Sequence, residues 1–174
     1  MSRYTRHDRE LKISIKAIVI VVSSSRYKDL VSGKQVEDPS GDLAVKLLTN
    51  NGIDVVDKII VPDNITEIRR VIYDFTDKVN LILLIGGTGV TRDDVTLEAV
   101  KPLLDKELPT FSQLFTLLSY EDVGTAVLPS RTTAGIKNRT LIFCIPGSIG
   151  AVNLALNKII IPELGHLINM LLNL

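Results

Sequence analysis

The stretch Leu-Ile-Leu-Leu-Ile-Gly-Gly-Thr-Gly, residues 81–89, joins five consecutive apolar residues to a glycine-rich turn. An uninterrupted apolar run is typical of a parallel strand that is covered on both faces. Because glycines carry no side chain, the backbone N–H groups that follow can approach and surround an anion. The stretch predicts a buried strand that ends in a phosphate-binding loop at Gly86, Gly87, Thr88 and Gly89. A tight turn without a ligand is the alternative.

Apolar runs and helical repeats alternate through the rest of the chain. Apolar and β-branched residues predict further buried strands at residues 17–22, 53–61 and 141–145. Apolar residues at spacings of three and four predict helices at 43–50, 65–78, from about 96, at 109–120 and at 149–174, where Pro162 must break or restart the helix. Residues 126–136 could hold a short hairpin. This order predicts a single α/β domain with helices on both faces of a mainly parallel, doubly wound sheet.

Residues 23–41 are mainly polar and follow the first predicted strand. They contain Gly33, Pro39 and many charges, and they form a longer connection than compact domains usually have without a function. We interpret the segment as a mobile flap over a site. A disordered insertion explains the same composition equally well.

Composition narrows the classes of function. The 174 residues, 45% of them hydrophobic, suffice for the core of one domain, which we place at residues 13–174 after a flexible N-terminus at 1–12. Twenty basic and twenty acidic residues leave no net charge, which argues against a nucleic acid or an anionic membrane as partner. The N-terminus lacks the pattern of a signal peptide, and the apolar runs are far shorter than the roughly 20 residues that span a bilayer. We expect a cytoplasmic protein.

The cysteine and the histidines point to no catalytic or metal centre. Cys144 is the only cysteine and lies inside the apolar run 141–145, so it predicts a small core residue in a reducing compartment. His7 and His166 show no metal-ligand spacing, and no Ser/His/Asp set can be recognised. Any anionic ligand must therefore be held by other local groups.

Carboxylates follow two of the predicted strands. Asp93 and Asp94 come shortly after the glycine loop, and Asp63 follows the strand at 53–61. Carboxylates beside a phosphate repel it unless a cation lies between them, and Mg²⁺ commonly takes one or two carboxylates plus phosphate oxygens. A metal role is one hypothesis for these residues. Capping of the following helices is the other, and for Asp63 the pattern alone favours the cap.

Two further segments could contact an anion. Pro146, Gly147 and Ser148 form a turn after the last strand, with a helix N-terminus behind it, although a plain connection is the simpler interpretation. Ser130 and Arg131 could supply a hydroxyl and a guanidinium, but surface loops often carry such pairs without a ligand. Neither GxxxxGK[ST] nor GxGxxG is present, which weakens kinase-like and nicotinamide-binding interpretations.

Four segments, in this order and spacing, resemble the MoaB/MogA family of molybdenum cofactor biosynthesis proteins and the related G domains of gephyrin-like proteins. They are Asp38-Pro39-Ser40-Gly41, Val61-Pro62-Asp63, the block at residues 86–99, and Pro146-Gly147-Ser148. The resemblance runs from about Ile15 to the C-terminus. Two departures are visible. Ser23-Ser24-Ser25 is followed by Arg26 where the family often has Ser-x-Ser-Asp, and Ser148 is followed by Ile149 rather than by proline.

The resemblance implies a three-layer α/β/α fold that forms trimers, sometimes hexamers, with molybdopterin bound in a surface pocket around the glycine loop. It implies a molybdopterin adenylyltransferase, a nucleotidyltransferase that uses ATP and Mg²⁺. A non-catalytic molybdopterin carrier or scaffold is the alternative, and the downstream metal-insertion protein is a further expected partner. The chain is too short for the second domain of the CinA type, which shares this fold.

The resemblance also implies roles for individual residues. Asp63 and Asp94 correspond to the family's two metal-associated aspartates, with a catalytic role. The expected molybdopterin- or nucleotide-binding residues are Ser23, Asp38, Ser40, Gly41, Gly86, Gly87, Thr88, Gly89, Ser130, Arg131, Pro146, Gly147 and Ser148.

Overall fold

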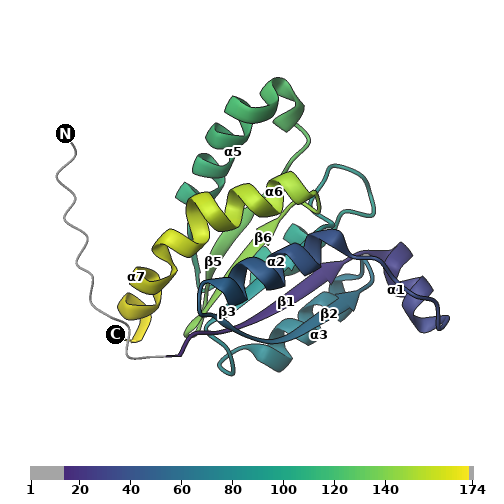
Figure 1. The fold of residues 1–174 in the computed structure, drawn as a ribbon, viewed down its shortest axis with the longest axis horizontal. Helices are drawn as coiled ribbons and strands as arrows, with labels where there is room; N and C mark the ends of the chain where they lie inside the picture. Colours follow the sequence, from purple (N-terminus) through teal and green to yellow (C-terminus); the bar gives the residue numbers. More distant parts are fainter. Residues whose placement is uncertain (1–13, 173–174) are drawn as a thin grey trace.

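The computed structural model describes residues 14–172, so the predicted flexible segment 1–12 and His7 lie outside it. The sheet in this part of the chain has six strands in the order β2-β1-β3-β6-β5-β4 (Figure 1). Their bounds are β1 Lys16–Val22, β2 Asp54–Val61, β3 Leu81–Ile85, β4 Lys106–Glu107, β5 Thr133–Lys137 and β6 Thr140–Ile145. The first four strands in spatial order are parallel, whereas β5 runs antiparallel to β6 and β4 antiparallel to β5. The prediction of a mainly parallel sheet is confirmed.

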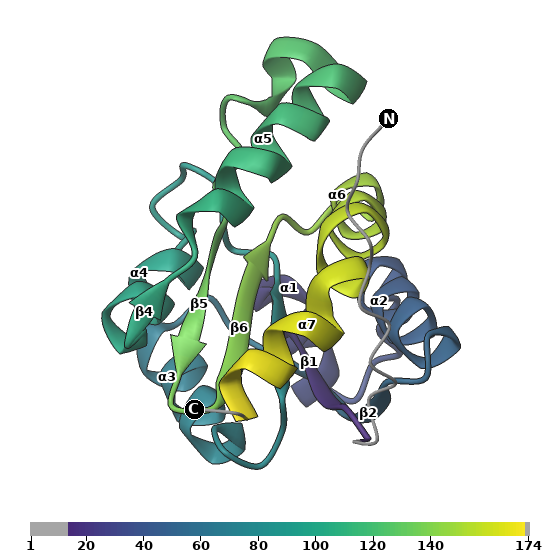
Figure 2. The same ribbon diagram turned by 90° about the vertical axis from the view of Figure 1, so that its left-hand side faces the viewer.

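Helices cover both faces of the sheet and make three layers, as expected (Figure 2). One face is covered by α2 Pro39–Asn50, α5 Pro109–Val123, α6 Ile149–Leu154 and α7 Ile161–Leu172. The other is covered by α3 Ile65–Phe75 and α4 Thr96–Val100. A further helix, α1 Ser24–Val31, follows the carboxyl end of β1 and buries none of its residues.

The central strands are apolar throughout because each contributes to two cores. Successive side chains of a strand point to opposite faces. Val19 of β1 packs with Leu48 of α2 in one cluster, and Ile20 packs with Ile68 of α3 in the other. Residues 17–22 are at most 3% exposed. Cys144 lies in the second cluster, where burial raises the pKa of its thiol, so the prediction of a core cysteine is confirmed.

The interpretation of residues 23–41 as one long flap is wrong. Residues 24–31 form α1, and α2 begins at Pro39, so only residues 32–38 are irregular. Ser23 caps α1 by accepting a hydrogen bond from the Arg26 N–H, and Pro39 stands in the first turn of α2, where its missing N–H costs nothing. The apolar residues of α1, Tyr27, Leu30 and Val31, stand at helical spacing but none is buried, so the segment has only a short helical signal in the sequence.

Other element boundaries also differ from the prediction. No hairpin forms within residues 126–136. Instead β5 pairs with β6 across a tight turn at Asn138, whose φ is 53°. The helix expected at 65–78 ends at Phe75, just before Asp77 takes a left-handed φ of 66°. A π-helical segment, Ala155–Ile160, joins α6 to α7, and Pro162 lies in the first turn of α7, which agrees with a restart there.

The N-terminus of α2 lies close to the end of β1, and Gly41 makes this possible. An ideal Cβ on Gly41 would overlap the carboxylate of Asp38, the N-cap of α2, and would lie 2.9 Å from Cγ2 of Val21. We therefore expect Gly41→Ala to lower the free energy of unfolding by about 1–3 kcal/mol through overpacking. Urea denaturation measures this change.

Gly150 provides the matched control. It lies in α6, and an added Cβ there would meet no atom within 4 Å. Gly150→Ala should raise the free energy of unfolding by about 0.5–1 kcal/mol, because alanine loses less backbone entropy in a helix. Equal effects of the two substitutions would contradict the close packing assigned to Gly41.

Candidate functional site

The predicted ligand-binding segments meet at one edge of the sheet. β1, β2, β3 and β6 are parallel, so their carboxyl ends lie together. Hydrogen bonds between neighbouring strand ends hold the following segments in place. The Ser23 N–H donates to the Val61 carbonyl (2.9 Å), and the Gly86 N–H donates to the Ile145 carbonyl (3.0 Å). The edge thus gathers the start of α1, Asp63, the glycine loop and the turn at 146–148.

The glycine loop has a backbone shape that needs glycine at two positions. Gly86 and Gly87 have φ angles of 95° and 61°, and a Cβ on Gly86 would lie 2.6 Å from the Val22 carbonyl oxygen. Thr96 of α4 fixes the loop by donating its hydroxyl to the Gly86 carbonyl (2.8 Å) and its N–H to the Gly87 carbonyl (2.9 Å). Within the described residues the N–H groups of Gly87 and Thr88 donate to no acceptor. Two neighbouring donors are therefore free to bind an anion.

Asp63 lies against this loop and does not cap the helix that follows it. Asn64 is the cap of α3 and accepts from the Thr66 and Glu67 N–H groups (2.9 and 3.1 Å), so the cap interpretation of Asp63 is wrong. Oδ2 of Asp63 accepts instead from the N–H and hydroxyl of Ser24 (2.8 and 2.7 Å), at the start of α1. Oδ1 lies 2.8 Å from where a Cβ on Gly87 would be.

Asp94 lies against the other end of the loop. Its Oδ2 lies 2.8 Å from the Cβ position of Gly89 and accepts from the N–H and hydroxyl of Thr91 (2.9 and 2.6 Å). The Thr91 hydroxyl is the main group that holds the pKa of Asp94 below its usual value. Asp94 does not cap α4, whose N-cap residue, Val95, makes no side-chain bond. Its neighbour Asp93 is exposed.

Arg131 is engaged with the loop itself, which differs from the anion contact expected for it. Its Nε donates to the carbonyls of Thr88 (3.1 Å) and Gly89 (2.7 Å), and Nη2 donates to the carbonyl of Asp94 (3.2 Å). Both Nη atoms also contact the carboxylate of Glu98 (2.6 and 3.3 Å). This pairing raises the pKa of Arg131 and lowers that of Glu98. Arg131 therefore clamps the loop to α4. For Ser130, the structure gives only a backbone bond to Val127.

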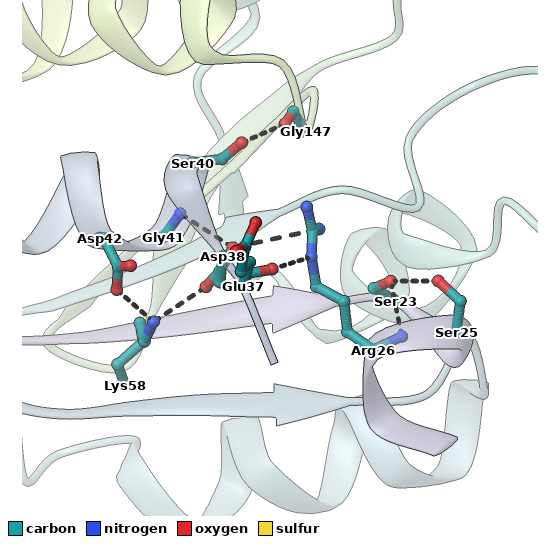
Figure 3. Close-up of polar contacts among 10 residues, drawn as sticks. All are labelled: Ser23, Ser25, Arg26, Glu37, Asp38, Ser40, Gly41, Asp42, Lys58 and Gly147. Carbon is teal, nitrogen blue, oxygen red and sulfur yellow. Dashed lines mark hydrogen bonds and ion pairs between the residues drawn. The ribbon is translucent and has the colours of Figure 1, made fainter. Parts of the chain in front are cut away.

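The start of α2 forms a second wall of the site (Figure 3). Asp38 is 2% exposed and accepts from the Gly41 N–H (3.1 Å) and from Nζ of Lys58 (3.1 Å). Ser40 donates its hydroxyl to the Gly147 carbonyl (2.6 Å) and so ties α2 to the turn after β6.

The turn at 146–148 completes the contact with the glycine loop. A Cβ on Gly147 would lie 3.4 Å from Cα of Gly86. Ser148 caps α6 by accepting from the Ala151 N–H (3.1 Å). We call the glycine loop, Asp63, Asp94 and this turn, together with the start of α2, the strand-end site. Its free N–H groups and helix N-termini favour an anion, and its two carboxylates favour a cation beside it.

Sequence reasoning missed Ser24, Lys58, Thr96 and Glu98 as residues that support the site. Ser24 reaches Asp63 across 39 positions of sequence, and Glu98 reaches Arg131 across 33. The positions of Thr96 and Glu98 inside the block at 86–99 were the available signals. No short-range pattern predicts the other contacts.

Other features of the described residues add no second chemical centre. No group of three or more His, Cys, Asp or Glu side chains within 14–172 could hold a metal, and His166 is exposed on α7. A hollow of about 670 Å³ lies at the opposite end of the strands, lined by residues that include Asn80 and Arg139, and it contains no predicted site residue. No helix formed by residues 14–172 has the length and apolar character that a membrane crossing requires.

Comparison with known proteins agrees with this geometry. The sequence model of the family described as "probable molybdopterin binding domain" matches residues 18–166. Molybdenum cofactor biosynthesis protein B of Staphylococcus aureus (strain MRSA252) is 45% identical over 166 residues, which cover 93% of this chain and 95% of that protein. A crystal structure of a molybdenum cofactor biosynthesis protein B matches with a TM-score of 0.84 at 37% identity, covering 93% of this chain and 98% of that one. The molybdopterin biosynthesis enzyme MoaB of Thermus thermophilus matches with a TM-score of 0.76 at 29% identity, covering 92% and 98%. The chain therefore belongs to the MoaB/MogA family of molybdopterin-binding domains.

Proposed function

We propose that this chain acts in molybdenum cofactor biosynthesis as a molybdopterin adenylyltransferase. The observation that carries the proposal is the position of Asp63 and Asp94, whose carboxylates lie against Gly87 and Gly89 of the same anion-binding loop. The relatives' names support the pathway, and the Thermus thermophilus relative is described as an enzyme.

The reaction exchanges one phosphorus–oxygen bond for another. A terminal phosphate oxygen of molybdopterin forms a bond to the α-phosphorus of ATP, and the bond from that phosphorus to the oxygen bridging to the β-phosphorus breaks. Pyrophosphate leaves, and AMP is joined to molybdopterin. Such chemistry depends mainly on positioning and on neutralising charge. A loop with fixed shape and a pair of carboxylates meets these two requirements.

The glycine loop supplies the anion contacts. The free N–H groups of Gly87 and Thr88 would bind phosphate oxygens, and the N-terminus of α6, behind Ser148, offers a second positive region. Thr88 is 3% exposed, so its hydroxyl can reach only a ligand that enters the loop. Ser40 and Arg131 would act by holding the walls in place, since both donate to backbone carbonyls of the site.

Asp63 and Asp94 would hold Mg²⁺. The donor set fits this ion, because Mg²⁺ binds one or two carboxylates and takes its other oxygens from phosphates and water. When bound, Mg²⁺ would neutralise the phosphates of ATP. Ser24 and Thr91 orient the carboxylates, since each occupies one oxygen of its aspartate with two hydrogen bonds.

We also propose that the protein self-associates as a trimer, two of which could pair as a hexamer. α5 extends away from the sheet and bears exposed apolar side chains on more than one side, Leu114, Leu117, Tyr120 and Val123, each more than 40% exposed. An exposed apolar surface of this kind favours contact with another protein surface. Sedimentation equilibrium should give three times the 19.1 kDa of the chain, or six times. A purely monomeric protein at micromolar concentration contradicts the proposal.

Replacing either carboxylate should remove most turnover without unfolding the protein. We expect Asp94→Asn, and likewise Asp63→Asn, to lower kcat by about 100-fold, or about 2.7 kcal/mol, because a neutral amide does not balance Mg²⁺. The double variant should lose less than the product of the two losses, since both act on one ion. Pyrophosphate release from ATP and molybdopterin measures the rate.

Asp93→Asn is the matched control for Asp94→Asn. Asp93 is the adjacent residue of the same type, but it is exposed and has no hydrogen bond within the described residues, so its removal should leave kcat within about twofold. Near-normal turnover by Asp94→Asn at saturating Mg²⁺ would overturn the metal assignment. Wild-type protein that binds molybdopterin but releases no pyrophosphate would instead be a carrier or scaffold.

Removing the Arg131 side chain should disturb the shape of the glycine loop, although Arg131 lies outside the loop. We expect Arg131→Met to lower kcat/KM by about tenfold or more, because the Thr88, Gly89 and Asp94 carbonyls lose their shared donor. The control is Arg70→Met, which removes exposed pairs with Glu67 and Asp74 on α3 and should change kcat/KM little. Equal kinetics of the two variants would show that the clamp does not shape the site.

A further inference from the structure

Arg26 lies beside the strand-end site, and the family resemblance assigns no role to it. It stands in the first turn of α1, after the N-cap Ser23, and its side chain extends over the end of β1 toward α2. A cation at a helix N-terminus opposes the helix dipole, so the position does not favour α1 itself. The reason for an arginine here must lie in what its guanidinium faces.

The guanidinium is anchored at one end and open at the other. Its Nε donates to the Glu37 carbonyl (3.1 Å), which fixes the plane of the group. Nη1 lies 4.0 Å from Oδ1 of Asp38, beyond hydrogen-bond range, and Nη2 has no partner within the described residues. Figure 3 shows the free end of the group turned toward the side of Gly147 and Ser40. An arginine held by its Nε keeps its Nη donors pre-oriented for a ligand.

The nearby acid, Asp38, has partners that lie closer than Arg26. Asp38 already has Nζ of Lys58 at 3.1 Å and the Gly41 N–H at 3.1 Å, and Lys58 also pairs with Asp42. Burial of Lys58 acts to lower its pKa, but the hydrogen bonds and ion pairs with Asp42 and Asp38 outweigh this effect. The pKa of Lys58 is therefore raised. The other guanidinium at this edge with defined contacts, Arg131, is occupied by carbonyls and Glu98. Arg26 therefore keeps Nη donors that no acceptor within the described residues uses at hydrogen-bond distance.

We propose that Arg26 binds a phosphate group of the ligand at the wall formed by α1 and α2, opposite the glycine loop. This inference rests on the proposed function, because it names a further contact for the same substrates. An arginine can bind a phosphate group through two parallel hydrogen bonds. The Nη atoms of Arg26 are available for this, because their nearest acceptor, Oδ1 of Asp38, lies 4.0 Å from Nη1. The phosphate belongs either to molybdopterin or to ATP, and the experiment separates these two sources.

Calorimetry in two arms tests the proposal, one with ATP and Mg²⁺ and one with molybdopterin alone. Arg26→Gln should weaken binding about tenfold in at least one arm, and the arm affected identifies the phosphate. Arg26→Lys should recover part of the loss, since it restores charge without the planar fork. Arg70→Gln is the control, because that arginine lies on exposed α3 and pairs only with residues of its own helix.

A combined variant separates ligand binding from a structural role. If Arg26 only balanced Asp38, Arg26→Gln together with Asp38→Asn would restore affinity, and asparagine would still cap α2. The proposal expects no restoration. Wild-type affinity of Arg26→Gln in both arms, or restoration in the combined variant, overturns it. Wild-type protein that binds neither ligand overturns the proposed function itself, which is a distinct outcome.

Discussion

The close approach of the glycine loop to the end of β1 is the constraint on which the site depends. Gly86 lies so near the Val22 carbonyl that no Cβ fits between them, and Gly87 is similarly enclosed by Thr96, Asp63 and Val22. The loop can therefore turn sharply at the end of β3 and leave the N–H groups of Gly87 and Thr88 without an acceptor within the described residues. Every other group of the site is placed relative to this turn.

The two carboxylates of the site are supported in the same manner from opposite sides. Each has one oxygen bound by the N–H and hydroxyl of a single residue, Ser24 for Asp63 and Thr91 for Asp94. These bonds fix the orientation of each carboxylate, so little ordering is left for the moment of ligand binding. Ser24 belongs to a helix that buries no residue, which indicates that α1 serves the site more than the core.

Some of the charged side chains at the site are paired with other protein groups. Arg131 is committed to the loop carbonyls and Glu98, and Lys58 is committed to Asp38 and Asp42. These pairs join neighbouring segments at the sheet edge. A buried carboxylate such as Asp38 requires a cation beside it. Within the described residues, the N–H groups of Gly87 and Thr88 and Nη2 of Arg26 have no acceptor.

The sequence by itself determined the fold class, the central strands and the segments that make the site. Strands buried on both faces leave apolar runs, and a tightly enclosed turn with positive φ favours glycine, so both leave local signals in the chain. Tertiary structure alone decided which side chains of these segments pair with one another. Asp63 reaches Ser24 rather than its own helix, and Arg131 turns to the loop carbonyls. These contacts join residues more than 30 positions apart, and the packing that brings such residues together leaves no periodic pattern in the sequence.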